Sequence, residues 1–494
     1  MEACSKTNKA AIKEEKDKST HILLAANSGR EIKSSLFAHE SSSFPPSLTS
    51  KGKMHHGEKS EILDCIVTKD LEQDKPITTA AVLDGAVIVQ MLRPRNSVTF
   101  EDYITNELWP YIRSWVENND RVDIVWDIYS KYSLKTGTRE KRGGGTRRRV
   151  TLHTKIHGNW AEFLRVDLNK QELFVEIAKT LSLMELPEEK QLFNTLLDGC
   201  ITSPSNVDVS AVAPCTQEEA DSRIFLHVAA AASAGHRSII IRTTDSDVVV
   251  LGVAAYVSLK DKIDELWIAF GVGQNYRYLP IHRIAEGLGQ KAAALPAFHA
   301  ITGCDTTSSF FGKGKKTAWS VWQDLPGLTV PLTLLSTANP TEQILINYSA
   351  LLQKFVVNLY GLSESEIESV DDARHYLFLK KGKDFVQMPP GSDAFYQHLL
   401  RAAHQSGYVW GNMLNKAPAD ASHSITDWGW QQLSVDEAPT PMFTTIPLLS
   451  KSLPELVSCK CKSVCKPPCS CCMHGQSCMI LCACKGECKQ NTTF

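Results

Sequence analysis

The sequence has no long apolar run, no apolar signal core at its start and almost no net charge. Among its 494 residues, no stretch approaches the roughly 18 uninterrupted apolar residues that a membrane span needs. We therefore expect a soluble, non-secreted protein without a membrane partner. The formal net charge of -2 argues against a polyanion-binding surface spread over the whole protein. Contacts with nucleic acid would have to come from local basic patches.

Two segments of the chain are locally basic. Between Lys131 and Arg149 there are eight Lys or Arg residues against one Glu, and from Lys451 onward six Lys against two Glu. The first segment is equally typical of a solvated loop or a nuclear-import signal. We expect nucleic acid, with DNA favoured, as the partner of these segments and a nuclear location for the protein. Protein partners cannot be read from the sequence.

Composition divides the chain into five regions. Residues 1–75 are rich in Lys, Glu, Ser and His and predict a disordered leader. Residues 76–335 alternate short apolar runs with helical stretches, which predicts an α/β domain with a mostly parallel sheet flanked by helices. Helical periodicity over 336–435 predicts a helical extension. A Pro-containing linker over 436–454 leads to a cysteine-rich module over 455–490.

Acidic residues follow the apolar runs of the α/β region. Asp84 follows AAVL, Asp127 follows DIVW, and Asp245 follows SIIIRTT with Asp247 two residues on. Ligands of an open α/β sheet bind beyond the carboxyl ends of its strands, so these carboxylates are expected to converge there. Such a cluster repels itself unless cations neutralise it, and two Mg²⁺ or Mn²⁺ ions at such a site support phosphodiester cleavage. Taken singly, each acid is more typical of a turn or a helix cap.

The order of these motifs along residues 80–325 resembles the flap-endonuclease (XPG-type) class of PIN-like nucleases. The series is LDGAVIV, VWDIYS, EEADSR, TTDSDVVVLG and TGCDTTSSFFGKGKKTAW. The resemblance implies a PIN-like fold, a structure-selective nuclease activity and two Mg²⁺ or Mn²⁺ ions. The acids that it assigns to these ions are Asp84, Asp127, Glu219, Asp221, Asp245, Asp247 and Asp305.

The resemblance extends to two basic features. The segment YSKYSLKTGTREKRGGGTRRRV is similar to the arch base of that family, with Lys135 and Arg142 where its phosphate-facing cations lie. The segment FFGKGKKTAW is similar to its Gly-rich hairpin, which holds duplex DNA through backbone amides and lysines. The arch region is short, so threading of a single-stranded flap is not implied. The residues expected to contact DNA are Arg147, Arg148, Arg149, Lys313, Lys315 and Lys316.

Ten of the 15 cysteines lie between Cys459 and Cys488. In a chain without a secretion signal this density indicates metal rather than disulfides, although a disulfide knot or a tail without defined metal is the alternative. Leaving out Cys472, the spacing is C-x-C-x3-C-x3-C-x-C-x6-C-x3-C-x-C-x3-C. Nine thiolates fill the twelve ligand positions of three tetrahedral Zn²⁺ ions if three of them bridge. The predicted zinc ligands are Cys459, Cys461, Cys465, Cys469, Cys471, Cys478, Cys482, Cys484 and Cys488.

This spacing resembles the tesmin-type CXC domain, a Zn3Cys9 module whose members often contact DNA. The sequence departs from that pattern in carrying Cys472 and in lacking the Tyr that often precedes the fourth cysteine. The segment has few apolar residues, so metal binding would supply its folding free energy. The sequence therefore predicts a two-metal nuclease with a zinc-binding DNA-docking tail. The alternative is a catalytically inactive PIN-like scaffold that binds DNA or chromatin.

Overall fold

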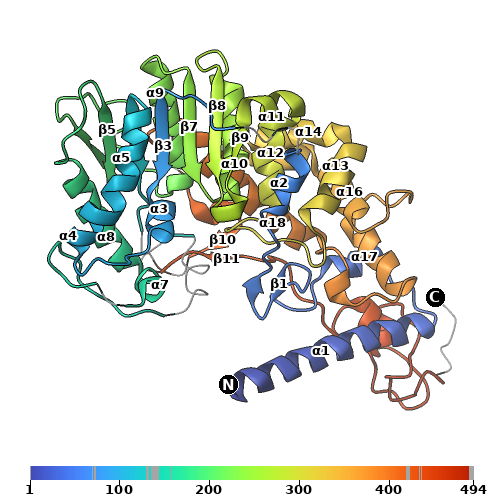
Figure 1. Ribbon diagram of the computed structural model, residues 1–494. Coiled ribbons are helices and arrows are strands. Elements are labelled where there is room, and N and C mark those ends of the chain that lie inside the picture. The colour runs from blue at the N-terminus through green and yellow to red at the C-terminus, as the bar shows by residue number, and fades with distance from the viewer. Residues whose placement is uncertain are drawn as a thin grey trace.

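A seven-stranded sheet forms the centre of the protein in the computed structural model (Figure 1). The described residues are 2–68, 71, 74–129, 133–134, 144–156, 158–418, 423–432, 434 and 437–488. In order across the sheet, the strands are β6 (Gly199–Ser203), β5 (Gln191–Leu196), β4 (Arg121–Val125), β3 (Ala80–Asp84), β7 (Ser238–Thr243), β8 (Glu265–Phe270) and β9 (Arg277–Pro280). The five central strands are parallel, whereas β6 and β9 are antiparallel to their neighbours.

Both faces of the sheet are buried, which explains the apolar runs in β3, β7 and β8. In β3, Ala81 and Leu83 pack into the apolar cluster on one face, and Ala80 and Val82 pack into the cluster on the other. Successive side chains of a strand point to opposite faces, so a strand buried on both sides is mostly apolar, and the charges that β4 does bury, on Arg121 and Asp123, pair with each other at 2.7 Å. This arrangement confirms the predicted α/β class with a mostly parallel sheet.

Four long helices flank the sheet. They are α5 (Trp109–Asn118), α8 (Asp167–Leu181), α9 (Ala220–Ser233) and α10 (Ser246–Leu259). Phe225 of α9 and Val249 of α10 share one cluster with the sheet, and Ile112 of α5 and Leu173 of α8 share the other. In Figure 1, α5 lies in front of the sheet and α10 behind it.

The strand order creates a crevice at the carboxyl end of the sheet. The chain leaves β3 toward β4 on one side, and β7 later pairs with β3 on the other side. The connections that follow β3 and β7 therefore diverge, and ligands of open α/β sheets bind at such a switch point. Asp84 is the last residue of β3, and Asp245 lies two residues beyond β7.

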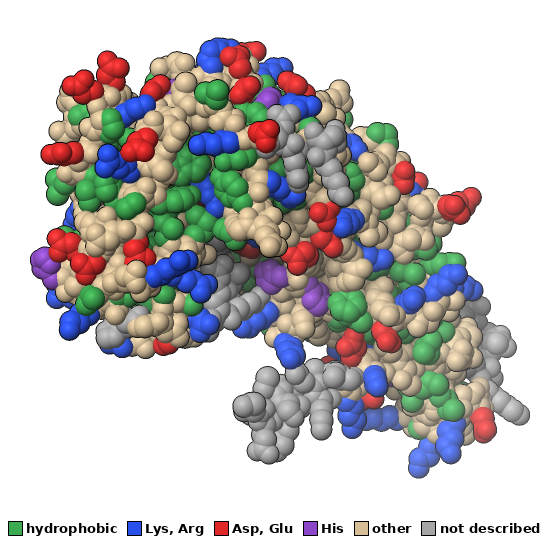
Figure 2. All heavy atoms as spheres, in the orientation of Figure 1, with side chains coloured by type: hydrophobic (Ala, Val, Ile, Leu, Met, Phe, Trp, Pro, Cys, Tyr) green, Lys and Arg blue, Asp and Glu red, His purple; other side chains and the backbone are tan. Residues whose placement is uncertain are grey.

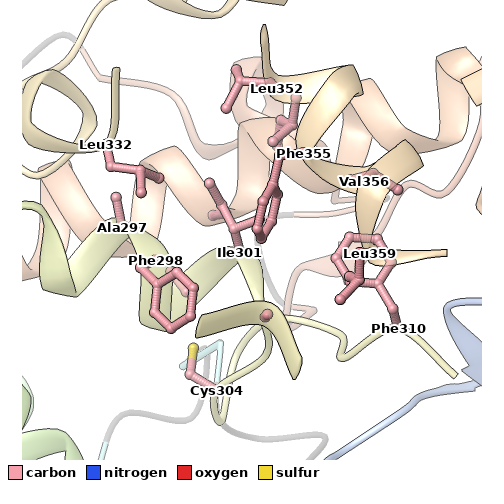
Figure 3. Close-up of a cluster of buried hydrophobic side chains, with 14 of the residues drawn as sticks. Ala297, Phe298, Ile301, Cys304, Phe310, Leu332, Leu352, Phe355, Val356 and Leu359 are labelled. Atoms are coloured by element: carbon pink, nitrogen blue, oxygen red, sulfur yellow. The ribbon is translucent and has the colours of Figure 1, made fainter. Parts of the chain in front are cut away.

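Helices dominate residues 281–412. They are α11 (Ile281–Leu288), α12 (Lys291–Ile301), α13 (Lys315–Asp324), α14 (Thr329–Leu335), α15 (Glu342–Asn347), α16 (Ser349–Leu359), α17 (Val370–Leu379) and α18 (Ser392–Ala403), followed by the π-helix η7 (His404–Val409) and the 3-10 helix η8 (Trp410–Asn412). Figure 3 shows Ile301 of α12, Leu332 of α14 and Phe355 of α16 in one buried cluster. Helices on both sides of residue 335 thus share one core. The predicted boundary at 335 stays a prediction.

Short elements complete the described chain. They are the helices α3 (Gly85–Met91), α4 (Phe100–Tyr103), α7 (Trp160–Phe163) and α19 (Ser470–Met473), the π-helix η3 (Ile104–Leu108), the 3-10 helices η4 (Gly273–Asn275), η5 (Pro326–Leu328), η6 (Phe385–Gln387), η9 (Ile425–Trp428) and η10 (Pro454–Leu456), and the strand pair β10 (Trp430–Gln431) and β11 (Thr440–Pro441). No helix among the described residues combines the length and the apolar character that crossing a bilayer requires.

Residues 1–75 differ from the predicted disordered leader. They contain α1 (Glu2–Asn27), the 3-10 helix η1 (Ser34–Ala38), the strand pair β1 (Thr49–Ser50) and β2 (Lys53–Met54), and α2 (Glu61–Ile66). Glu40 forms a buried ion pair with Arg374 of α17 at 3.0 Å. The polar composition of this region predicted disorder because composition does not reveal tertiary partners, and here those partners lie hundreds of residues away.

The N-terminal region also contacts the cysteine-rich module. Arg30, which is 5% exposed, donates to the carbonyl oxygens of Glu455, Val457 and Ser477 at 2.8 Å each and to the Cys471 sulfur at 3.3 Å. Figure 1 shows α1 running beside this C-terminal part of the chain. The two ends of the described chain therefore pack together.

Candidate metal and nucleic-acid site

Two of the predicted acids are fixed where central strands end. Asp84 is the last residue of β3 and caps α3, since its Oδ1 accepts from the Val87 N–H at 3.1 Å and its Oδ2 accepts from the Thr243 hydroxyl at 3.0 Å. Asp127 lies just beyond β4, and its Oδ1 accepts from the Ala220 N–H at 2.9 Å, where α9 begins. Both carboxylates are thereby oriented by backbone groups of other elements.

Three further acids meet at the starts of α9 and α10. Asp245 caps α10 by accepting from the Asp247 N–H at 2.9 Å, and Asp221 lies in the first turn of α9. One carboxylate oxygen from each of Asp221, Asp245 and Asp247 lies within 4.8 Å of the others, so the three could hold a metal ion. The donors are all carboxylate oxygens, which fits Mg²⁺ or Mn²⁺.

A cavity of about 780 Å³ opens at this edge of the sheet. Six of the seven predicted acids line it, namely Asp84, Asp127, Glu219, Asp221, Asp245 and Asp305. Asp247 is buried beneath them, where its Oδ1 lies 3.0 Å from Nε2 of the fully buried His299. The fold thus brings the seven acids of the sequence prediction to one place.

Gly85 allows close packing at this edge of the sheet. It directly follows Asp84, and a Cβ at this position would lie 2.3 Å from the ring of Trp126. Only glycine therefore allows the indole to pack against the backbone beside the Asp84 carboxylate. The D-G pair in LDGAVIV reflects this close approach.

The electrostatics of the acids reflect crowding and burial. Burial and the Asp127 carboxylate raise the pKa of Asp84 to about 7, although hydrogen bonds from Val87 and Thr243 oppose the shift. Burial and Asp247 likewise raise the pKa of Asp245, against the effect of the Lys59 ammonium. Burial lowers the pKa of His299 to about 4, so this histidine is neutral beside Asp247. The cluster favours additional positive charge.

Lys59 is a residue of this site that the sequence did not indicate. Its Nζ lies 2.9 Å from Asp245 Oδ1, 3.3 Å from Asp247 Oδ2 and 3.4 Å from Asp305 Oδ2. Burial disfavours its charge, but the carboxylates of Asp247, Asp245 and Asp305 outweigh this and raise the pKa of Lys59 above its ordinary value. No motif marked Lys59, since it lies in the region predicted to be disordered.

Three further cations, Arg93, Arg165 and Lys170, also line the cavity, and both arginines are exposed. Lys170 pairs with Asp167 at 2.8 Å and lies over the ring of Tyr129 at 3.9 Å, while the Tyr129 hydroxyl donates to Asp127 Oδ2 at 3.1 Å. Sequence reasoning missed these three cations because they belong to no recognisable motif.

The predicted arch cations are only partly covered by the structure. Lys135 and Arg142 lie outside the described residues. Arg147 pairs with Glu172 of α8 and donates to Asn169 Oδ1 at 3.1 Å, and the Arg148 N–H donates to the same oxygen at 2.8 Å. Arg148 and Arg149 are exposed. The described part of this basic segment therefore runs along α8.

The structure corrects the prediction that Lys315 contacts DNA. Lys315 is 3% exposed, and its Nζ donates to the carbonyl oxygens of His299 at 3.1 Å and Gly303 at 2.8 Å and to the Thr302 hydroxyl at 2.9 Å. Burial lowers its pKa to about 8. Its ammonium ties the start of α13 to the end of α12, so it cannot reach a phosphate.

The two neighbouring lysines remain accessible. Lys316 pairs with Asp64 at 2.7 Å, and both side chains are 59% exposed. The Lys313 Nζ lies 4.8 Å from the centre of the Tyr360 ring. Lys313 is half-buried and Lys316 is exposed, and their role as DNA contacts stays a prediction.

The cysteine-rich module gathers its sulfurs around a central triangle. The sulfur of Cys459 lies 3.5 Å from that of Cys465 and 3.7 Å from that of Cys478, which are 3.3 Å from each other. Three groups of four sulfurs, each within 4.8 Å, could hold a metal ion: Cys459, Cys461, Cys465 and Cys469; Cys459, Cys465, Cys478 and Cys484; and Cys459, Cys471, Cys478 and Cys482.

Two cysteines lie outside these groups. The Cys488 sulfur accepts from the Cys465 N–H at 3.0 Å, so this predicted ligand is adjacent to them. Cys472 instead places its sulfur 3.4 Å from the Cys465 carbonyl oxygen. Cys459 belongs to all three groups, Cys465 and Cys478 belong to two each, and the groups contain eight of the nine predicted ligands.

No protein-family model matches this sequence, and neither does any curated protein. Two solved structures of the catalytic core of Rad2 in complex with DNA substrate resemble it. One is 14% identical with a TM-score of 0.32, over 69% of this chain and 94% of that chain. The other is 11% identical with a TM-score of 0.32, over 70% of this chain and 99% of that chain. Similarity at this level does not establish a shared function.

Proposed function

We propose that the protein is a metal-dependent, structure-selective nuclease that cleaves phosphodiester bonds, with DNA as the favoured substrate. The observation that carries this proposal is the convergence of acids from separate strands and helices on one cavity, which Arg93 and Arg165 also line. Carboxylates suit Mg²⁺ or Mn²⁺, and exposed cations attract the phosphates of a nucleic acid. Metal-dependent cleavage of a phosphodiester can use both.

Each part of the cavity has a role in this proposal. A divalent ion, when bound, would activate a water molecule and polarise the scissile phosphate. The exposed Arg93 and Arg165 would orient phosphate oxygens toward the acids. Lys135 and Arg142 keep the phosphate-facing role that the resemblance implies. The residues that would hold metal are Asp84, Asp127, Glu219, Asp221, Asp245, Asp247 and Asp305.

We further infer that the cysteine-rich module binds three Zn²⁺ ions and docks on DNA in the nucleus. Cys459, Cys465 and Cys478 would be the bridging thiolates, since each of them belongs to more than one of the three groups of sulfurs. The exposed Lys460 and Lys462 supply positive charge on the module. As a tether, the module would raise the local concentration of DNA at the acidic cavity.

The nuclease proposal is tested by incubating purified full-length protein with labelled flap, bubble and single-stranded DNA and RNA in the presence of Mg²⁺ or Mn²⁺. We expect metal-dependent cleavage that the Asp245→Ala, Asp247→Ala double variant lowers by at least about 100-fold, because these acids would hold the metal. Lys190→Ala is the matched control, since its ion pair with Asp120 at 3.0 Å is away from the cavity. Cleavage that survives the double substitution would reject this site.

Removal of residues 455–494 tests whether the cysteine-rich module contributes to DNA binding without contributing to metal-dependent cleavage. We expect weaker DNA binding with the metal dependence of cleavage unchanged. DNA affinity equal to that of the full chain would count against the tether.

One observation favours the rival, a DNA-binding scaffold that does not cut. The Lys59 ammonium already pairs with Asp245, Asp247 and Asp305. If those pairs persist and prevent metal from entering, the domain would bind nucleic acid without cleaving it. Metal-independent DNA binding together with no cleavage of any of the substrates would support this scaffold.

A further inference from the structure

Lys59 belongs to a segment that is anchored across the cavity edge. This segment, residues 47–66, is named here the leader strap. Its Ser47 and His55 carbonyl oxygens accept from the N–H groups of Phe311 and Ser309 at 2.9 Å each. On the other side of Lys59, the Glu61 carboxylate accepts from the Lys315 N–H at 3.0 Å.

The strap is therefore held by contacts that do not involve the Lys59 ammonium. Helix α2, which forms its last part, packs against α13, and Asp64 of α2 pairs with Lys316. Gly314 leaves room for the strap, because a Cβ there would lie 2.6 Å from the Glu61 carboxylate. Lys59 thus enters the acid cluster from a fixed backbone.

The Lys59 ammonium occupies a position that a metal ion would otherwise favour. Carboxylates from three places in the chain converge on this one nitrogen within 3.4 Å, and the side chain is only 27% exposed. Two of these carboxylates, Asp245 and Asp247, also belong to the group that could hold a metal ion. A divalent ion at the same point would overlap the ammonium group and would also be repelled by its positive charge.

We propose that Lys59 permanently takes the place of one of the two metal ions that the resemblance implies, so that the acid cluster binds a single exchangeable divalent ion. This inference rests on the proposed nuclease function. Asp247 and Asp305, which two ions would otherwise share, would pair with the ammonium, and the ligands of the remaining ion would be Asp84, Asp127, Glu219 and Asp221, with Asp245 shared between the ion and the ammonium. The ammonium would supply fixed positive charge to the site without depending on metal concentration.

Counting the bound metal tests this inference. Full-length, zinc-loaded protein is titrated with Mn²⁺, and the bound ions are counted by electron paramagnetic resonance and by isothermal titration calorimetry. We expect one Mn²⁺ per chain in the wild type, because Lys59 fills the other position. We expect two in Lys59→Met, with a spin-coupled spectrum from neighbouring ions. Lys59→Gln is a second uncharged variant in case the first does not fold, and it should also bind two.

Three controls assign the ions. Lys59→Arg keeps the positive charge and should keep one ion. Lys53→Met changes an exposed lysine of the same strap and should also keep one. Asp84→Asn should remove the wild-type ion, which places it in the acid cluster. As a second measurement, Mn²⁺ should raise the melting temperature of Lys59→Met more than that of the wild type.

The outcomes distinguish this inference from the proposed function. Two Mn²⁺ ions in the wild type, with affinities equal to those in Lys59→Met, would overturn the inference and leave the nuclease proposal standing. A Lys59→Met protein that cuts faster while still binding one ion would also overturn it, in favour of an inhibitory strap. No Mn²⁺ sensitive to Asp84→Asn in any of these proteins would reject the metal site itself.

Discussion

The acid cluster and the cysteine-rich module are both candidate metal sites, and they are built in opposite ways. The acids lie at the edge of a sheet whose two faces are packed against large apolar clusters. The module, by contrast, buries mainly its own sulfurs, and Leu456, Val457 and Met479 are among its few buried apolar residues. The scaffold builds the first site, whereas the ligands themselves make up the core of the second.

This difference has a thermodynamic consequence. The acids are oriented by helix caps and backbone N–H groups, so their positions do not depend on metal. Their mutual repulsion lowers stability, which is accepted at a site that binds cations. The sulfurs of the module have no comparable scaffold, and a metal would have to supply their folding free energy.

The largest expected effect is the response to zinc removal. If the module and the acid site both stayed folded without zinc, the proposed difference in how the two sites are stabilised would be wrong. A strong chelator should unfold residues 455–488, since structural zinc contributes on the order of 10 kcal/mol to such modules. Thiol titration should reveal the cysteines between 459 and 488, while hydrogen exchange in β3 and β7 stays slow. Slow exchange of the module in excess chelator would contradict this prediction.

The next effect concerns Asp84 and pH in the metal-free protein. Because the pKa of Asp84 is raised to about 7 in the folded state, its contribution to stability is fully present below the unfolded value of about 3.8 and is lost as pH rises through 7. Asp84→Asn should therefore stabilise the metal-free protein by roughly 3 kcal/mol at pH 8 and by little at pH 4. Urea unfolding at the two pH values measures it.

The sign of the stability change at pH 8 shows whether the ionised Asp84 carboxylate destabilises the metal-free protein. Asn retains an acceptor for the Val87 N–H, so the cap of α3 is preserved. An Asp84→Asn protein that is less stable than the wild type at pH 8 would show that the acid site is not strained. The same variant should lose cleavage.

A smaller effect is expected where the two ends of the chain meet. Arg30→Ala removes charge-assisted hydrogen bonds to three carbonyl oxygens and one sulfur, which should weaken the module by roughly 2 kcal/mol. Competition with a zinc chelator should show a corresponding loss of zinc affinity. The exposed Lys33→Ala is the control and should leave it unchanged. Equal affinities for Arg30→Ala and wild type would mean that the module folds independently of the leader.

The smallest effect is expected at Lys316. Its ion pair with Asp64 is more than half exposed on both sides, so Lys316→Ala should change the free energy of unfolding by less than about 1 kcal/mol. Its effect on DNA affinity should be modest and should shrink at high salt. The adjacent Lys315→Met should instead destabilise the α12–α13 junction without a specific effect on the salt dependence. If Lys315→Met lowered DNA affinity in a salt-dependent way and Lys316→Ala did not, Lys315 would be the DNA contact.

Much of the acid site was predictable because of how parallel sheets are built. Strands buried on both faces are rich in apolar residues, so β3, β4 and β7 stood out in the sequence together with the acids at or just beyond their ends. The strands β5, β6 and β9 were not predicted, since QLFNTL, GCITS and RYLP mix polar and apolar residues. The spacing of the cysteines was equally visible, because metal ligands leave a local pattern.

The amino-acid sequence alone indicated the apolar central strands β3, β4 and β7, the acids at their carboxyl ends and the set of sulfurs, since each depends on patterns within a few residues. Two contacts became visible in the folded chain alone. Lys59, which lies 186 residues before Asp245 in the sequence, enters the acid cluster, and Arg30 supports the module. The tertiary structure also decided that Lys315 is buried while Lys316 is exposed. The physical reason is that burial and charge pairing depend on distant partners, which no local pattern of residues records.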